Sequence, residues 1–283
     1  MPSTSTLATI LAGVAAVSAH GHVSGVVVNN KWYSGWNPSY AYENPVPAVA
    51  GWTASNLDNG FGKHLSRLTK KQHPLPFTNK KLILIYNTVS PSAYTSGDIV
   101  CHKAATPGKA YIPVAGGDTL NIQWTEWPSG HKGPVLDYLA NCNGDCTTVD
   151  KTSLQWVKVD ESGLLSGSTV PGTFATDTLV NNNSTWVLKL PNLKPGNYVL
   201  RHEIISLHSA GSSNGAQNYP QCLNLQVTGS GTETLGSGEP ATKFYGASDP
   251  GILINIYQKL TSYTIPGPKV ASLKKRAEKA FQA

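Results

Sequence analysis

The chain has 283 residues, of which 27 are glycine, 19 are proline and 13% are charged, and its formal net charge is +6. This composition is typical of a loop-rich β protein, and the length allows one large domain or two small ones. The positive charge comes from residues 63–88, which carry +6, and residues 269–283, which carry +4, whereas the remainder carries −4. Because the body of the chain is mildly acidic and has no nucleic-acid-binding motif, we expect no nucleic-acid partner.

The first 19 residues predict a secretory signal peptide. Residues 7–17 are apolar, and Val17, Ser18 and Ala19 place small residues where a signal peptidase cuts. A membrane span would need about 20 apolar residues, and no second apolar run follows, so we expect a secreted, extracellular protein without a membrane anchor. Cleavage after Ala19 would make His20 the first residue of the mature chain.

Short runs rich in Val, Ile, Tyr and Trp predict β-strands, and turn clusters such as residues 115–118 and 194–197 separate them. No convincing amphipathic helix interrupts them. Many short strands with Gly/Pro turns favour an all-β fold, an immunoglobulin- or fibronectin-like antiparallel β-sandwich with long surface loops, over residues 20–268. The predicted strands are residues 23–28, 110–114, 119–124, 154–159, 185–190, 198–207, 222–227 and 252–257.

Two segments interrupt this pattern. Residues 63–88 are either a basic surface insertion or the translation of a retained intron, because codons for Gly62-Lys63, Leu68-Thr69 and Thr88-Val89 can carry donor, branch and acceptor signals. Excision would preserve the frame and join Phe61 to Val89. Residues 269–283 form a basic tail, which we expect to be a loosely attached helix or a disordered end.

Four cysteines in a secreted chain predict two disulfides, and from the residues alone three pairings remain open. The cysteines are Cys101, Cys142, Cys146 and Cys222. Asn182 and Asn183 head overlapping Asn-X-Ser/Thr acceptors, so we expect N-glycosylation there.

A free His20 would offer two nitrogens, its α-amine and its imidazole, which together suit Cu(II). One more imidazole would complete a planar set of three. Apart from the two histidines of the insertion, the chain offers His22, His102, His131, His202 and His208. His131 stands out because turn residues around it predict a surface loop. His22 allows an alternative, an adventitious chelate through backbone amides, unless residues 20–22 enter a strand.

A second group of polar residues lies at the end of residues 198–210 and shortly after them. His208 lies at the predicted strand end, and Gln217 and Tyr219 come shortly before Cys222. An imidazole, an amide and a phenol gathered here could be ordinary hydrogen-bonded core. They could equally surround a copper ion that reacts with oxygen.

Six stretches make a resemblance specific. They are residues 20–23, 98–110, 127–139, 201–210, 215–227 and 249–257. In this order they resemble the fungal lytic polysaccharide monooxygenases of auxiliary activity family 9, formerly classed as glycoside hydrolase family 61. The resemblance implies one copper ion held by the amine and ring of His20 and by His131, with Tyr219 in the axial position. It also implies that His208 and Gln217 steer the chemistry of bound oxygen species.

The same resemblance implies a substrate, a surface and a disulfide pattern. The enzyme would be a monomer that cleaves β-1,4-glucan oxidatively at C1, C4 or both, using an external electron donor and O2 or H2O2. Tyr42 and Tyr257 would lie on a flat face that binds the polysaccharide. The disulfides would be Cys101–Cys222 and Cys142–Cys146.

Two rival functions remain. A glycosidase needs two carboxylates at a fixed separation, and Glu126, Asp137 and Glu203 are candidates, although none belongs to a recognisable acid/base motif. A non-catalytic carbohydrate-binding or copper-storage sandwich is the other rival. Oxidised oligosaccharides that require both copper and a reductant would distinguish the monooxygenase from both.

Overall fold

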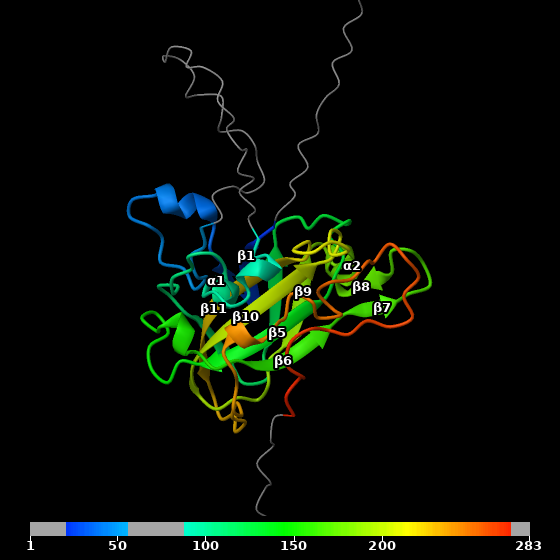
Figure 1. Cartoon of the computed structure of the whole chain (residues 1–283). Helices are drawn as coiled ribbons and strands as arrows, with labels where there is room; N and C mark the ends of the chain where they lie inside the picture. The colour runs from blue at the N-terminus through cyan, green and yellow to red at the C-terminus, as the bar shows by residue number, and fades with distance from the viewer. Residues whose placement is uncertain (1–20, 56–87, 273–283) are drawn as a thin grey trace, which may run out of the picture.

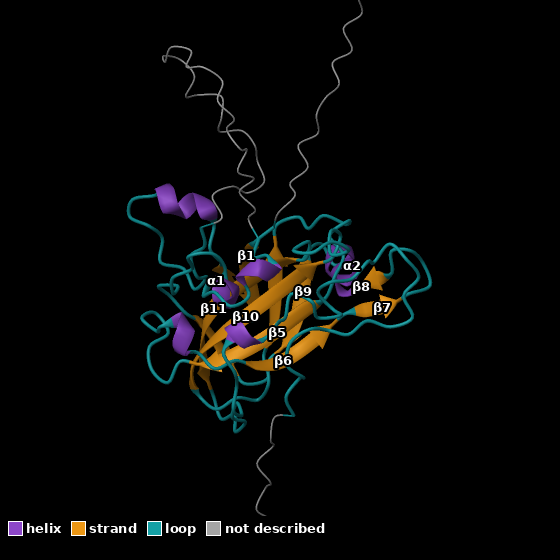
Figure 2. Cartoon of the chain, viewed as in Figure 1, coloured by secondary structure: helices purple, strands orange, loops and turns teal. Residues whose placement is uncertain are grey.

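The computed structural model describes residues 21–55 and 88–272, which fold into two main β-sheets with long connecting loops (Figures 1 and 2). The predicted signal peptide, His20, nearly all of the basic insertion and most of the basic tail lie outside the described residues. None of the helices in the described part of the chain has the length and apolar character that crossing a bilayer requires.

The first sheet has four antiparallel strands in the order β2-β1-β4-β9. Their bounds are Val23–Val28 (β1), Lys31–Ser34 (β2), Thr119–Trp124 (β4) and Thr185–Lys189 (β9). In β4 and β9 every second residue is buried. One face of this sheet therefore packs inward and the other faces solvent.

The second sheet has five strands in the order β3-β11-β10-β5-β6. Their bounds are Ile112–Ala115 (β3), Val135–Asn141 (β5), Val157–Ser162 (β6), Gly196–Ser206 (β10) and Gln217–Thr228 (β11). Only the β3–β11 pair is parallel among the strand pairs of the described residues. In β5 and β10 consecutive residues are buried, so both faces of this sheet are covered.

Two apolar cores cover the two faces of the five-stranded sheet. Between the sheets, side chains such as Ile122 and Trp124 pack with Leu139, Leu200 and Tyr219. On the other face of the five-stranded sheet, the second core joins residues of β5, β10 and β11 to residues of several loops and short helices. The covering segments contribute Trp52, Ile99, Phe244, Tyr245 and Ile252, among others.

Short helices and one small ribbon occupy the loops. The helices are η1 (Pro38–Tyr42), η2 (Pro91–Ala93), α1 (Asp98–Cys101), η3 (Lys151–Ser153), α2 (Ala175–Asn181) and η4 (Ala241–Lys243). The ribbon pairs β7 (Leu164–Ser166) with β8 (Thr173–Phe174). In Figure 1 α2 lies close to this ribbon, at the end of the molecule where β9 begins.

The all-β sandwich expected from the sequence is confirmed, with several corrections to individual elements. The strand predicted at residues 252–257 is wrong: Ile252 and Ile256 are buried, but the segment packs on the second core without joining a sheet. The strand expected at 154–159 begins three residues later, at Val157. Helix α2 and strands β2 and β5 were not predicted.

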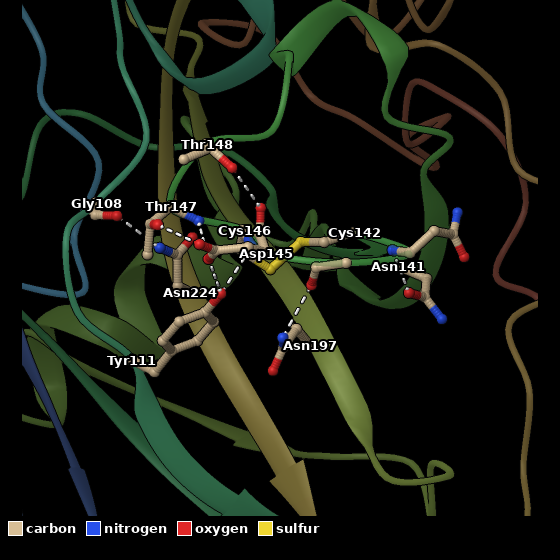
Figure 3. The surroundings of a disulfide bond; sticks show 12 residues. Gly108, Tyr111, Asn141, Cys142, Asp145, Cys146, Thr147, Thr148, Asn197 and Asn224 are labelled. Atoms are coloured by element: carbon tan, nitrogen blue, oxygen red, sulfur yellow. Dashed lines mark hydrogen bonds between the residues drawn. A yellow bond between two sulfur atoms is a disulfide. The ribbon is translucent and has the colours of Figure 1, made fainter.

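Both disulfides implied by the resemblance form in the structure, Cys101–Cys222 and Cys142–Cys146. The short one closes a turn after β5 (Figure 3). Around it the Tyr111 hydroxyl donates to Asp145 Oδ1 at 2.6 Å, and Cys146 N donates to the same Tyr111 oxygen at 2.7 Å. The register of β10, which pairs Tyr198 with Asn141, places this turn at the opposite end of the strand from Ser206.

Candidate metal centre

The predicted site residues come from three segments that meet at one end of the sandwich. Strand β10 ends at Ser206, which pairs with Gln217 at the start of β11. In the other sheet, Val23 at the start of β1 pairs with Trp124 at the end of β4. The loop that leaves β4 therefore runs between the beginning of the described chain and the β10–β11 end.

His131 is held in this loop by its neighbours. Its backbone N donates to Pro128 O at 2.9 Å, which closes a turn. Two residues on, Gly133 N donates to the Thr176 hydroxyl of α2 at 3.0 Å, and Lys132 forms an ion pair with Asp177 of the same helix. The unpredicted helix α2 thus anchors the residues that follow His131.

His131 and His208 lie ring against ring. Their ring centroids are 4.1 Å apart and the rings are tilted by 46°. The Ser206 hydroxyl lies 2.7 Å from His208 Nδ1 and fixes the orientation of that imidazole. Ser206 was missed from the sequence, because β10 ends at Ser206 and His208 lies in the turn that follows.

Tyr219 combines complete burial with a polar contact. Its hydroxyl donates to Gln217 Oε1 at 2.9 Å, and its ring packs edge-on against Trp127 at 5.0 Å. Burial raises the pKa of Tyr219 well above the usual value for tyrosine. Burial therefore favours the protonated phenol over the phenolate.

The described chain begins beside the same loop. His22 N donates to the Thr125 hydroxyl at 3.1 Å, and Thr125 N donates to His22 O at 2.9 Å. A Cβ added to Gly21 would lie only 3.1 Å from Trp127 Cε3. Gly21, the residue that follows the predicted amino-terminal ligand in the sequence, therefore lies next to the loop that carries His131.

These contacts argue against the alternative chelate at His22. That chelate needs deprotonated backbone amides, whereas the His22 N–H is engaged with Thr125. The imidazole of His22 is buried, and burial lowers its pKa to about 4. His22 is therefore a neutral part of the packed chain start.

The carboxylates proposed for a glycosidase do not form a site. Glu203 is fully buried and accepts from Arg201 at 2.6 Å and from Asn218 at 2.8 Å. Asp137 is also fully buried and is bound by His202 at 2.7 Å and by the Trp186 indole at 3.0 Å. Both carboxylates are occupied by structural partners, and Glu126, the third candidate, is exposed, so the rival glycosidase pair is not supported.

The remaining predicted residues lie on the surface. Tyr42 is 77% exposed and Tyr257 is 56% exposed. Asn182 and Asn183 are exposed in the turn between α2 and β9.

The nitrogen donors near His131 suit a copper ion, whereas the described side chains do not form a complete metal site by themselves. Over residues 21–55 and 88–272, no group of three or more His, Cys, Asp or Glu side chains could hold a metal ion. His131 supplies an imidazole at the end of the molecule where the chain starts, and an amine and a second imidazole from His20 would complete a nitrogen set suited to Cu(II). The tight approach of Gly21 to Trp127 is the structural observation that agrees with this donor set.

Comparisons with known proteins identify the family. The model of Auxiliary Activity family 9, formerly GH61, matches residues 20–264. The AA9 family lytic polysaccharide monooxygenase cel61A of Hypocrea jecorina is 51% identical over 268 residues, covering 94% of this chain and 70% of that protein. Monooxygenase I of Botryotinia fuckeliana is 49% identical over 267 residues, covering 93% and 89%.

A solved structure agrees with these sequences. The extended catalytic domain of H. jecorina LPMO9A superposes with a TM-score of 0.76 at 50% identity, covering 89% of this chain and 91% of that one. The chain therefore belongs to auxiliary activity family 9 and is a lytic polysaccharide monooxygenase, an oxidoreductase that cleaves polysaccharides.

Proposed function

We propose that the mature chain begins at His20, binds one copper ion and cleaves β-1,4-glucan such as cellulose at C1, C4 or both. An external electron donor and O2 or H2O2 complete the reaction. The observation that supports this most is the meeting, at one end of the sandwich, of the chain start with His131, His208, Gln217 and Tyr219.

The α-amine and imidazole of His20 and the imidazole of His131 would hold the ion, and the Tyr219 phenol would complete the set of residues around it. When bound, copper supplies one-electron chemistry that can oxidise a C–H bond of the sugar. The ligand nitrogens must be unprotonated to bind the ion, so its affinity should weaken in acid.

Residues around the ligands orient the side chains of Gln217 and His208, which can donate a hydrogen bond or hold a proton. The Tyr219 hydroxyl occupies Gln217 Oε1, which leaves the amide NH2 of Gln217 to donate to a polar group bound beside it. Ser206 orients the imidazole of His208 through Nδ1, so that Nε2 is the atom that can hold or pass a proton. Both roles are fixed before substrate arrives, because the hydrogen bonds lie within the folded chain.

The exposed rings of Tyr42 and Tyr257 would stack on the sugar rings of the polymer. We further propose that the protein is secreted as a monomer after removal of residues 1–19, and that it is N-glycosylated at Asn182 or Asn183. Residues 20–268 would be the catalytic unit.

The status of residues 63–88 is a separate proposal. The segments on either side of the insertion lie along the same edge of β11, since Gly51 bridges to Leu223 and Val89 to Asn218. This arrangement is compatible with a shorter connection in which Phe61 is followed by Val89, as excision of an intron would produce. Sequencing the mature transcript tests the idea, and a message that retains these codons rules it out.

The function itself is tested on cellulose with copper and a reductant such as ascorbate, with mass spectrometry of the soluble products. We expect oligosaccharides oxidised at C1 or C4, and their loss in His131→Ala because one imidazole of the copper site is removed. Copper affinity at the parent level in His131→Ala would contradict the ligand assignment. New reducing ends formed without a reductant would favour a hydrolase instead.

A further inference from the structure

Trp127 contacts three separate parts of the candidate metal centre. Its indole N–H donates to the carbonyl oxygen of His131 at 3.1 Å. Its ring packs edge-on against Tyr219, with centroids 5.0 Å apart, and Gly21 approaches its six-membered ring so closely that a Cβ would lie 3.1 Å away. The chain start, the loop imidazole and the buried phenol therefore share one side chain as a neighbour.

Trp127 is itself held in place from behind. Its side chain is 2% exposed, and its backbone N donates to the Ser184 hydroxyl at 3.0 Å. Trp124 packs edge-on against it at 5.1 Å, and the Trp124 indole in turn donates to His202 Nε2 at 2.9 Å in the core. A ring confined in this way cannot shift without moving both sheets, because protein interiors are close-packed.

We propose that Trp127 is a positioning residue that sets the separation between Gly21 and the loop residue His131, and thereby the geometry of copper binding. This inference rests on the proposed copper function. Trp127 contacts Gly21 and donates a hydrogen bond to His131. It also packs on Tyr219, so all three residues are positioned relative to the same ring. A Cβ at position 21 would lie 3.1 Å from the ring, so either the ring or the chain at Gly21 has to move by a few tenths of an ångström.

The test compares Trp127→Phe with a matched control, Trp186→Phe. Each substitution removes one indole N–H donor. In Trp127→Phe the acceptor that loses its donor is His131 O, and in Trp186→Phe it is Asp137 Oδ2, at 3.0 Å. Trp186 lies on β9 in the core between the sheets, so its loss should lower stability without touching the chain start. Both variants are produced with the amino terminus at His20 verified by mass spectrometry.

We measure Cu(II) affinity by titration calorimetry and the electron paramagnetic resonance spectrum of the copper-loaded protein, at a temperature where every variant is folded. We expect Trp127→Phe to weaken Cu(II) binding by about two- to tenfold, the worth of one lost hydrogen bond, and to change the copper hyperfine splitting. Trp186→Phe should keep the parent affinity and spectrum.

Gly21→Ala provides a second and independent variant, because it changes the contact from the side of the chain start. It should shift the spectrum in the same way without removing any hydrogen bond. Parent-like affinity and spectra in both Trp127→Phe and Gly21→Ala would overturn the positioning role. If the parent itself binds copper no more tightly than His131→Ala, the proposed function fails, which is a different outcome.

Discussion

At the scale of single residues, Tyr219 shows how burial and a polar contact combine. Its ring belongs to the core between the sheets, while its hydroxyl reaches Gln217 Oε1. Tyr219→Phe would keep the ring and remove the hydrogen bond. We expect a loss of about 1 kcal/mol in unfolding free energy and a clear decrease in oxidised products, because Gln217 would lose the partner that orients it.

A matched control lies at the other end of the same sheet. The Tyr198 hydroxyl donates to Lys194 O at 3.0 Å, far from His131. Tyr198→Phe should cost a similar amount of stability and leave product formation unchanged. Equal product yields from the two variants, measured at equal folded fractions, would show that the Tyr219 hydroxyl has only a structural role.

At the scale of elements, helix α2 supports the loop that carries His131. Asp177 accepts from Phe174 N at 2.7 Å at the start of the helix and also forms the ion pair with Lys132. Asp177→Asn keeps an acceptor for Phe174 N but removes the charge that holds Lys132. Since both partners are partly exposed, we expect a modest loss of about 0.5–1 kcal/mol, smaller at high salt because charges are screened.

Hydrogen exchange offers a local measurement of this support. In Asp177→Asn the amide of Gly133, which donates to Thr176, should exchange faster than in the parent. Asp150→Asn is the control, because Asp150 accepts from Thr152 N in the separate helix η3. An unchanged exchange rate at Gly133 would mean that α2 does not depend on this ion pair to hold the loop.

At the scale of the whole molecule, the two disulfides should differ in their contribution. Cys101–Cys222 joins residues 121 positions apart, and Cys142–Cys146 joins residues 4 apart. In the chain-entropy model these loops stabilise the fold by about 5 and about 2 kcal/mol, respectively. Denaturant unfolding of the two double Cys→Ala variants should show the larger loss for Cys101 and Cys222. Equal losses would contradict the entropic explanation.

Alkaline pH should also destabilise the whole fold. Burial raises the pKa of Tyr94, Tyr138, Tyr219 and Tyr245, and the negative charge of Glu203 raises it further for all but Tyr219. Unfolded tyrosines ionise near pH 10. Above that pH the unfolded state binds fewer protons than the folded state, so stability falls as pH rises.

This effect can be followed by phenolate absorbance together with circular dichroism. The absorbance of these buried phenols should appear in the same pH step as the loss of secondary structure. Tyr245→Phe should reduce the amplitude of that step. Complete ionisation of all 12 tyrosines while the circular dichroism remains native would contradict the assignment of buried, protonated phenols.

Strand prediction was most accurate at β1 and β4, whose bounds agree with the sequence pattern. In β4 the buried and less buried side chains alternate, which is a local feature. Strand β1 does not alternate, but its valine-rich run ends at a turn. Strand β5 was missed, and both of its faces are buried, so its residues show no alternation. Strand β10 is buried on both faces as well, but its residues 198–207 were predicted from their composition. In β11 the prediction began at Cys222, after Pro220, whereas the strand begins at Gln217.

For the candidate site, too, some features follow from the sequence and others only from the tertiary structure. By itself the sequence determined the fold class, the family resemblance and the candidate ligands, because cleavage signals, turn residues and motif order are carried by neighbouring residues. Only the tertiary structure decided that Trp127 joins Gly21, His131 and Tyr219, and that Asp137 and Glu203 are buried structural carboxylates. Such relations connect residues far apart in the chain, and their energies depend on packing and desolvation that no local pattern encodes.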